Sequence, residues 1–424
     1  MRTNVEERLR LARPNAGGPT LEATTIARER ALAALPDRHR RARIAVAAAG
    51  IAAAAAVVLA VELRSGAEVA SAAQVRAAVS QTLASASNLS GTLVIDDPDR
   101  GEQRWSFALD SAGDLRLKGL DTNDDLAIDG TADTIRFSQG PRFSTSTDVS
   151  PQTSAFSPDW MLEREVGSVI SALAADRDAE VQDVEYDGRP AWLLTIRAVG
   201  QDGGTIERKI TVDRSLGLPV HDVLRSSGRL LGEWRLESLA VDSNLPPEAF
   251  SLVPRPGQEV GTASEGSRRV DPSEIEATAG YAPLIARWLP DGYRFDHAAL
   301  SPSYTQSGDL AGDNIATFVY RRGLEQITVT TRPPAARLPF PMLQIGRFCT
   351  TRSISAIVCA NTGQTVETRD VTLRTGALAG ETAKVMIDIA APPTLTVETQ
   401  NLDVQISGDA DEAELMRIAE SFAR

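Results

Sequence analysis

An apolar run near the start of this 424-residue chain predicts a membrane-spanning helix. Residues 44–61 contain no charge and no proline. At about 1.5 Å per helical residue, a run of this length crosses most of a hydrocarbon core. We therefore predict a transmembrane helix over residues 44–63. A cleaved signal peptide is the alternative, with a cleavage site at 69–72, but signal peptides place a short basic segment before the run and here 43 residues precede it.

Beyond this run, apolar and polar residues mostly alternate with a period of two. That pattern is typical of antiparallel strands with one solvent-exposed face. On the first predicted strands, Trp105, Phe107 and Leu109 share one side, as do Leu115 and Leu117. Turns rich in Asp, Gly and Pro separate strands predicted at 92–95, 103–109, 114–120, 134–137, 179–186, 190–199, 205–212, 220–224 and 230–239, and later at 315–320, 326–331, 354–359 and 394–399.

A few segments show helical spacing instead. Val75, Val79 and Leu83 recur every four residues and predict a helix over 73–86. Further helices are predicted at 158–173, from about 275, and over 410–422. Prolines within 246–256 and a polar stretch at 258–269 mark a domain boundary. The predicted division is a cytoplasmic arm (1–43), the transmembrane helix (44–63), a linker (64–72), a first domain (73–254), a linker (255–272) and a second, smaller domain (273–424).

The charge distribution predicts the orientation in the membrane. Arg38, Arg40, Arg41 and Arg43 precede the apolar run, so the positive-inside rule keeps the N-terminus cytoplasmic and exports the remainder. Residues 1–43 carry a net charge of +5, whereas residues 64–424 carry −17. Binding of phosphate backbones needs a concentrated basic face. We therefore expect no nucleic-acid partner for the exported part.

The chain contains two cysteines, Cys349 and Cys359, and both belong to the predicted exported part. An oxidising compartment lets such a pair persist as a disulfide. We predict a disulfide between them, with two separate buried thiols as the alternative.

The order of elements in the first domain resembles the LolA-like fold of lipoprotein carriers and of RseB/MucB sensor domains. The resemblance lies in the strand, Leu-Pro turn and strand of residues 208–220 and in the Gly turn and strand of residues 228–236. It implies an α+β protein in which a curved antiparallel half-barrel with helices encloses an apolar cavity. Trp105, Phe107, Leu109, Leu115 and Leu117 would then line the ligand site, although an ordinary packed core is the alternative for these side chains.

The second domain resembles the C-terminal module of RseB-type regulators. Residues 289–293, 403–408 and 415–422 carry this resemblance, at both ends of the domain. The resemblance implies a smaller α+β domain with a mostly antiparallel sheet. RseB proteins are soluble partners of a separate membrane-spanning anti-sigma protein, whereas this chain is predicted to carry its own membrane helix.

The sequence contains no recognisable catalytic or metal-binding motif. His39, His221 and His297 lie in different segments, so no His/Cys metal site with known spacing can be assembled. The acidic stretch 121–125 begins like an EF-hand loop, but Leu126 stands where that loop needs glycine. We predict a solvated turn there, and we expect no enzyme activity, no metal and no cofactor.

We therefore predict a single-pass membrane protein that senses or regulates the state of the cell envelope. Its partners would be a membrane lipid or lipoprotein outside and a cytoplasmic sigma factor bound by residues 1–43. The alternative is a tethered lipid or lipoprotein carrier whose arm only sets topology. A helix in the arm that folds on a sigma factor favours the regulator, and a short, unpatterned arm favours the carrier.

Overall fold

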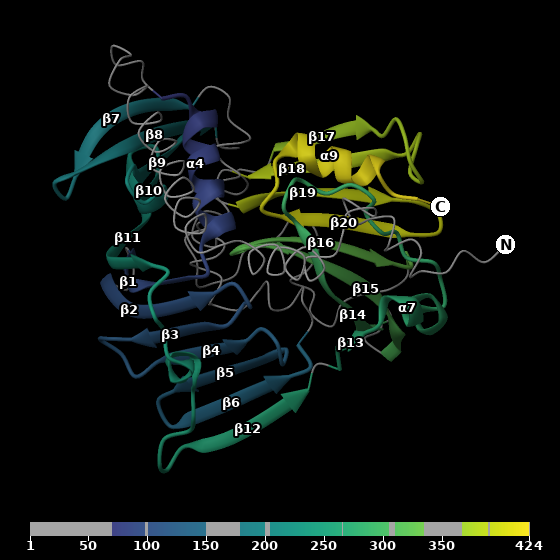
Figure 1. Cartoon of the computed structure of the whole chain (residues 1–424), viewed down its shortest axis with the longest axis horizontal. Coiled ribbons are helices and arrows are strands. Elements are labelled where there is room, and N and C mark those ends of the chain that lie inside the picture. The colour runs from purple at the N-terminus through teal and green to yellow at the C-terminus, as the bar shows by residue number, and fades with distance from the viewer. Residues whose placement is uncertain are drawn as a thin grey trace, which may run out of the picture. The chain divides into compact units, whose positions relative to one another are not determined.

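The structure is a computed structural model, which describes residues 70–97, 101–149, 179–199, 204–264, 266–304, 310–334, 367–388 and 391–423. These residues belong to one compact unit and fold mostly as antiparallel sheet with few helices (Figure 1). The arm 1–43, the predicted transmembrane helix 44–63, the predicted helix 158–173, Cys349 and Cys359 lie outside the described residues. Within the described residues, no helix combines the length and apolar character needed to cross a membrane.

Sheet A contains twelve strands in the described ranges. Neighbouring strands pair antiparallel, except that β12 runs parallel to β6. In spatial order the strands are β12 (Glu259–Ser264), β6 (Arg142–Thr147), β5 (Thr134–Gln139), β4 (Asp125–Asp129), β3 (Leu115–Gly119), β2 (Gly101–Asp110), β1 (Asn88–Asp97), β11 (Arg229–Val241), β10 (Leu218–Ser226), β9 (Thr205–Asp213), β8 (Arg189–Val199) and β7 (Glu180–Tyr186).

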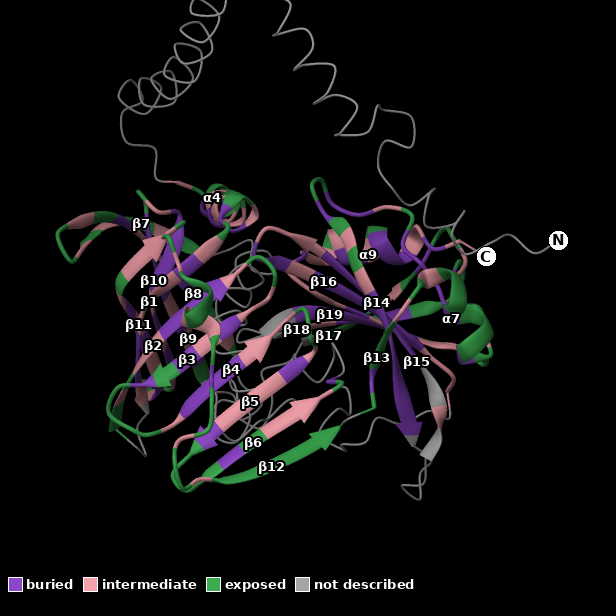
Figure 2. Ribbon diagram, turned by 60° about the horizontal axis from the view of Figure 1, so that its bottom comes forward, coloured by how far each residue is buried: buried purple, intermediate pink, exposed green. Residues whose placement is uncertain are grey.

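Sheet B contains eight strands in the described ranges, all paired antiparallel. Their spatial order is β13 (Arg268–Val270), β14 (Arg294–Tyr304), β15 (Leu310–Arg322), β16 (Glu325–Arg332), β20 (Asp403–Gly408), β19 (Ala391–Glu398), β18 (Thr382–Asp388) and β17 (Glu367–Thr372). Both β12 and β13 lie within residues 255–272, where the sequence predicts a linker. All six residues of β12 are exposed, as Figure 2 shows in green.

Helix α4 (Ala72–Ser85) begins at a capping box. Ser71 accepts a hydrogen bond from the backbone of Gln74 (3.3 Å), and the Gln74 side chain accepts one from the Ser71 backbone (2.8 Å). Val75, Val79 and Leu83 form one buried stripe, as their spacing predicts. This stripe packs against one face of sheet A, which we call the inner face, in a single apolar core.

The core of sheet B is closed by two helices, α7 (Pro272–Ala279) and α9 (Glu412–Glu420). In α9, Asp411 and Glu414 form a second capping box, and Leu415, Ile418 and Ala419 are buried. A short 3-10 helix, η1 (Pro247–Phe250), precedes β12. The predicted helix 410–422 therefore agrees with α9 to within about two residues at each end, the usual fraying of helix ends.

Candidate ligand-binding face

The five residues that the sequence predicts for ligand binding all lie on the inner face of sheet A. In the β2–β3 pair, Phe107 stands opposite Leu117 and Leu109 opposite Leu115. These four side chains are 3–5% exposed and belong to the core that α4 shares. Trp105 is half-buried and packs against the same core. The structure thus brings the five predicted residues together. They are packed in the core, so a ligand has to displace neighbouring side chains to reach them.

A buried ion pair interrupts this apolar face. Arg208 on β9 occupies an inward position between Ile206 and Ile210, and its guanidinium meets the carboxylate of Asp222 on β10. The Arg208 Nε lies 2.8 Å from Oδ2 and 3.1 Å from Oδ1 of Asp222, and Nη2 also contacts Oδ2. Each side chain is only 2% exposed. Charge-assisted bonds of this kind offset the cost of removing both charges from water.

Three indole N–H groups on the inner face have no acceptor among the described residues. They belong to Trp105, Trp192 on β8, and Trp234 on β11. Trp234 is 3% exposed and stands directly opposite Asp222 and Ile95 in neighbouring strands. Buried N–H groups in proteins are nearly always hydrogen-bonded. The inner face therefore offers spare donors within an apolar surface.

The outer face of sheet A carries a different kind of polar group. Charged side chains there pair across neighbouring strands, with Arg104 2.8 Å from Glu237 and Arg235 2.9 Å from Glu102. The hydrogen bond with Glu102 is the main reason that the pKa of Arg235 is raised. These side chains are partly exposed, and their charges are paired with one another. This pattern is that of a solvated sheet face rather than of a binding site.

A solvated turn was predicted for the acidic stretch 121–125, and this prediction is wrong for its last residue, Asp125. Asp125 begins β4, is 6% exposed and pairs with Arg255 (2.7 Å) and Arg116 (3.5 Å). Arg116 on the neighbouring strand β3 and Arg255 in the loop before β12 thus neutralise this carboxylate, which local sequence could not show. Among the described residues, no group of three or more His, Cys, Asp or Glu is placed to hold a metal ion.

Arg208, Asp222 and the tryptophans Trp192 and Trp234 are not among the ligand-binding residues predicted from the sequence. A signal was present, because Arg208 interrupts the apolar positions Ile206, Ile210 and Val212 of an alternating strand. A charge at an inward position predicts either a buried partner or a functional site. The partner itself comes from the next strand, and only the strand register identifies it.

No family model matches this chain, and a comparison with curated proteins also gives no match. Solved structures give fold likenesses. The MucA/MucB complex of Pseudomonas aeruginosa is 16% identical, with 82% of this chain and 98% of that chain covered and a TM-score of 0.29. An uncharacterised conserved protein from Thermus thermophilus is 14% identical (45% and 98% covered, TM-score 0.31), and a LolA superfamily protein from Nitrosomonas europaea is 11% identical (43% and 98%, 0.21).

Proposed function

We propose that this protein is a ligand-binding regulator of the bacterial cell envelope, and that its inner face binds an amphiphile with an apolar chain and oxygen acceptors. The observation that supports this function is the inner face itself. It combines apolar side chains with the indole N–H of Trp234 and the buried guanidinium of Arg208. Ligand sites are typically apolar with a few convergent polar groups, which is the composition found here.

An acyl chain suits this face energetically. Each methylene that leaves water contributes about 0.8 kcal/mol, so one chain supplies useful affinity before any polar contact forms. Ester or carboxylate oxygens of such a ligand would accept from the spare indole donors. A membrane lipid or the acyl group of a lipoprotein has this chemistry.

The contacts of α4 with sheet B favour the regulator over the carrier. A carrier needs only sheet A and its covering helices. Here Arg76 and Ser80 of α4 bind side chains of sheet B and α9. Through these contacts, a ligand that binds to sheet A and moves α4 also changes the second domain. A regulator requires such an effect. Binding of a sigma factor by residues 1–43 remains part of the proposal and is tested separately, with purified sigma factor and a chain that lacks this arm.

The ligand site is tested by energy transfer from tryptophan to a dansyl-labelled undecanoic acid, with the full chain in nanodiscs and protein-free nanodiscs as the blank. We expect saturable binding at micromolar probe. The variant Trp234→Phe keeps an aromatic side chain but loses one donor, so the affinity should fall about 5-fold, the value of one hydrogen bond. Trp288→Phe removes a different tryptophan, which packs against the core of sheet B, and should leave the affinity unchanged. Absence of saturable transfer in the unmodified protein would overturn the proposed site.

A further inference from the structure

Helix α4 contacts sheet A with one face and sheet B with the other. Its apolar stripe of Val75, Val79 and Leu83 forms part of the core on the inner face. Its polar side binds sheet B. Arg76 contacts the Asp411 carboxylate and lies 3.0 Å from Glu414, so it binds the two residues that cap α9. One helix therefore contacts both the candidate ligand face and the second sheet.

A second group of contacts surrounds Ser80. The Ser80 hydroxyl donates to Glu325 at the start of β16 (2.8 Å) and accepts from Arg322 at the end of β15 (2.8 Å). Arg322 also donates to Glu325 (2.5 Å), which is 1% exposed. Burial raises the pKa of the Glu325 carboxyl, against the opposing effect of Arg322. Two buried or half-buried polar groups of sheet B, on Arg322 and Glu325, are thus hydrogen-bonded to α4 through Ser80.

The β15–β16 turn fits closely against the end of α4. Leu324 is 7% exposed, belongs to the core of sheet A and donates its backbone N–H to the Leu83 carbonyl (2.9 Å). Gly323 has a φ of +59°, and a Cβ there would lie 2.4 Å from the same carbonyl. Interfaces packed this tightly respond to a displaced helix by switching contacts rather than by deforming smoothly.

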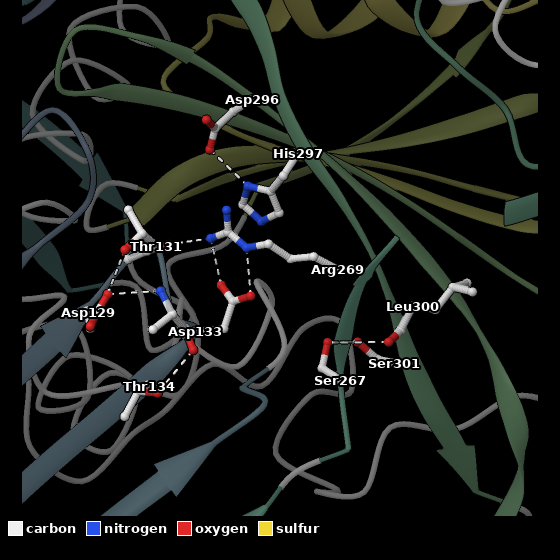
Figure 3. Close-up of polar contacts among 12 residues, drawn as sticks. Asp129, Thr131, Asp133, Thr134, Ser267, Arg269, Asp296, His297, Leu300 and Ser301 are labelled. Carbon is white, nitrogen blue, oxygen red and sulfur yellow. Dashed lines mark hydrogen bonds and ion pairs between the residues drawn. The ribbon is translucent and has the colours of Figure 1, made fainter. Parts of the chain in front are cut away.

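The two sheets also meet at a place that does not involve α4 (Figure 3). Arg269 of β13 binds both carboxylate oxygens of Asp133 in the β4–β5 turn, at 2.7 and 2.8 Å. This pair is drawn with dashed lines in Figure 3, beside His297, which lies 2.8 Å from Asp296. Breaking the Arg269–Asp133 pair loosens the two sheets without touching α4. This pair therefore serves as a control for effects that are specific to α4.

We propose that α4 couples occupancy of the inner face to sheet B: a ligand that enters beside Val79 and Leu83 displaces the helix and breaks its contacts through Arg76, Ser80 and Leu324. This inference rests on the proposed function of the inner face. By linkage, a ligand that weakens these contacts must bind more tightly once they are already weakened. The structure thus assigns α4 the role of relay between the ligand face and the second domain.

The coupling is tested in the full chain in nanodiscs with the same dansyl probe and the double variant Arg76→Gln/Ser80→Ala. Both substitutions lie on the polar side of α4, away from the apolar stripe. We expect the probe to bind about 5-fold more tightly or better, within the usual range of coupling between sites. Arg269→Gln breaks a contact between the two sheets that does not involve α4 and should leave the affinity unchanged. Equal affinity in the double variant and the unmodified protein would overturn the coupling, as would equal tightening by Arg269→Gln.

Hydrogen exchange in the unmodified protein gives a second readout that needs no variant to fold. Saturating probe should speed exchange at the amides of Leu324 and Glu414, which bond to the Leu83 carbonyl and the Asp411 carboxylate. Probe that binds without changing either amide would overturn the coupling and leave the proposed ligand site standing. Failure of the probe to bind at all would overturn the ligand site, and the coupling with it.

Discussion

The inner face of sheet A and the core of sheet B are both apolar, but in the part of the chain that the structure describes more of the buried hydrogen-bond donors lack an acceptor on the inner face. In sheet B, Tyr293 is fully buried and donates its hydroxyl to the Asp409 carbonyl (2.8 Å), and Tyr281 donates to the Thr331 carbonyl (2.6 Å). In sheet A, the indole of Trp234 is equally enclosed but has no acceptor among the described residues, and in sheet B the same holds for the Tyr320 hydroxyl. The inner face differs in gathering three such donors, on Trp105, Trp192 and Trp234, on one apolar surface, which suits it to a ligand.

Breaking the buried ion pair of sheet A should produce the largest change. Asp222→Leu leaves the Arg208 guanidinium enclosed without its carboxylate, and we expect a loss of about 3–5 kcal/mol in the free energy of unfolding. Adding Arg208→Met should restore most of that loss, because two apolar side chains then replace two charges. Denaturation followed by tryptophan fluorescence measures both. Glu237→Gln, in an ion pair on the outer face, is the control and should cost less than about 1 kcal/mol.

If Asp222→Leu costs no more than this outer-face control, the pair contributes nothing particular to the inner face. The contrast between the two faces of sheet A would then fail.

A smaller loss is expected where sheet B meets α4. Gly323→Ala adds both backbone strain at positive φ and a methyl group 2.4 Å from the Leu83 carbonyl. Gly140→Ala is a matched control, since Gly140 has a φ of +53° but open space around its Cβ. Strain alone costs about 1–3 kcal/mol, and Gly323→Ala should exceed the control because it also disturbs the contact. Equal thermal shifts for the two variants would show that the turn does not bear on α4.

A pair of conservative substitutions tests the comparison between the two cores directly. Tyr293→Phe leaves the Asp409 carbonyl without its donor and should cost about 1 kcal/mol. Trp234→Phe removes an N–H that has no acceptor among the described residues, together with part of the buried indole, so without ligand its cost comes from lost packing. Saturating fatty acid should enlarge this loss by about 1 kcal/mol, because the ligand accepts from the N–H, and should leave the loss at Tyr293 unchanged. A loss at Trp234 that the ligand does not enlarge would mean that this N–H is not available to a ligand.

The smallest effect concerns pH. The pKa of Glu325 is raised above its ordinary value of 4.5, mainly by burial. The folded protein therefore holds this proton more tightly than the unfolded chain. Its contribution to stability is fully present below 4.5 and is lost as the pH rises through the folded pKa. Glu325→Gln should flatten that part of the pH profile of unfolding. An unchanged profile would contradict the shift.

Local sequence patterns predicted much of this architecture because strands and helices have short periods. The alternation at Trp105, Phe107 and Leu109 and the four-residue spacing of Val75, Val79 and Leu83 identified β2 and α4 and the faces that they bury. The strands that were not predicted include β4, β6 and β12. β12 buries none of its residues, and β6 buries only Phe143, so neither shows an apolar period.

The polar features of the candidate site could not be predicted in the same way. Arg208 and Asp222 are 14 residues apart and meet through strand register. Arg76 and Asp411 are separated by 335 positions, and no local pattern relates them. Apolar periodicity shows which face is buried, but the pairing of charges on that face depends on contacts that only the fold creates.

Photolabelling tests the central claim, that the inner face of sheet A binds an amphiphile, most directly. The full chain in nanodiscs is irradiated with a diazirine-labelled fatty acid, and the modified residues are mapped by peptide mass spectrometry. We predict adducts at inner-face residues such as Phe107, Leu117 and Trp234, which an excess of unlabelled fatty acid suppresses. Adducts confined to the outer face, to sheet B or to membrane-proximal residues, with none on the inner face, would contradict the account.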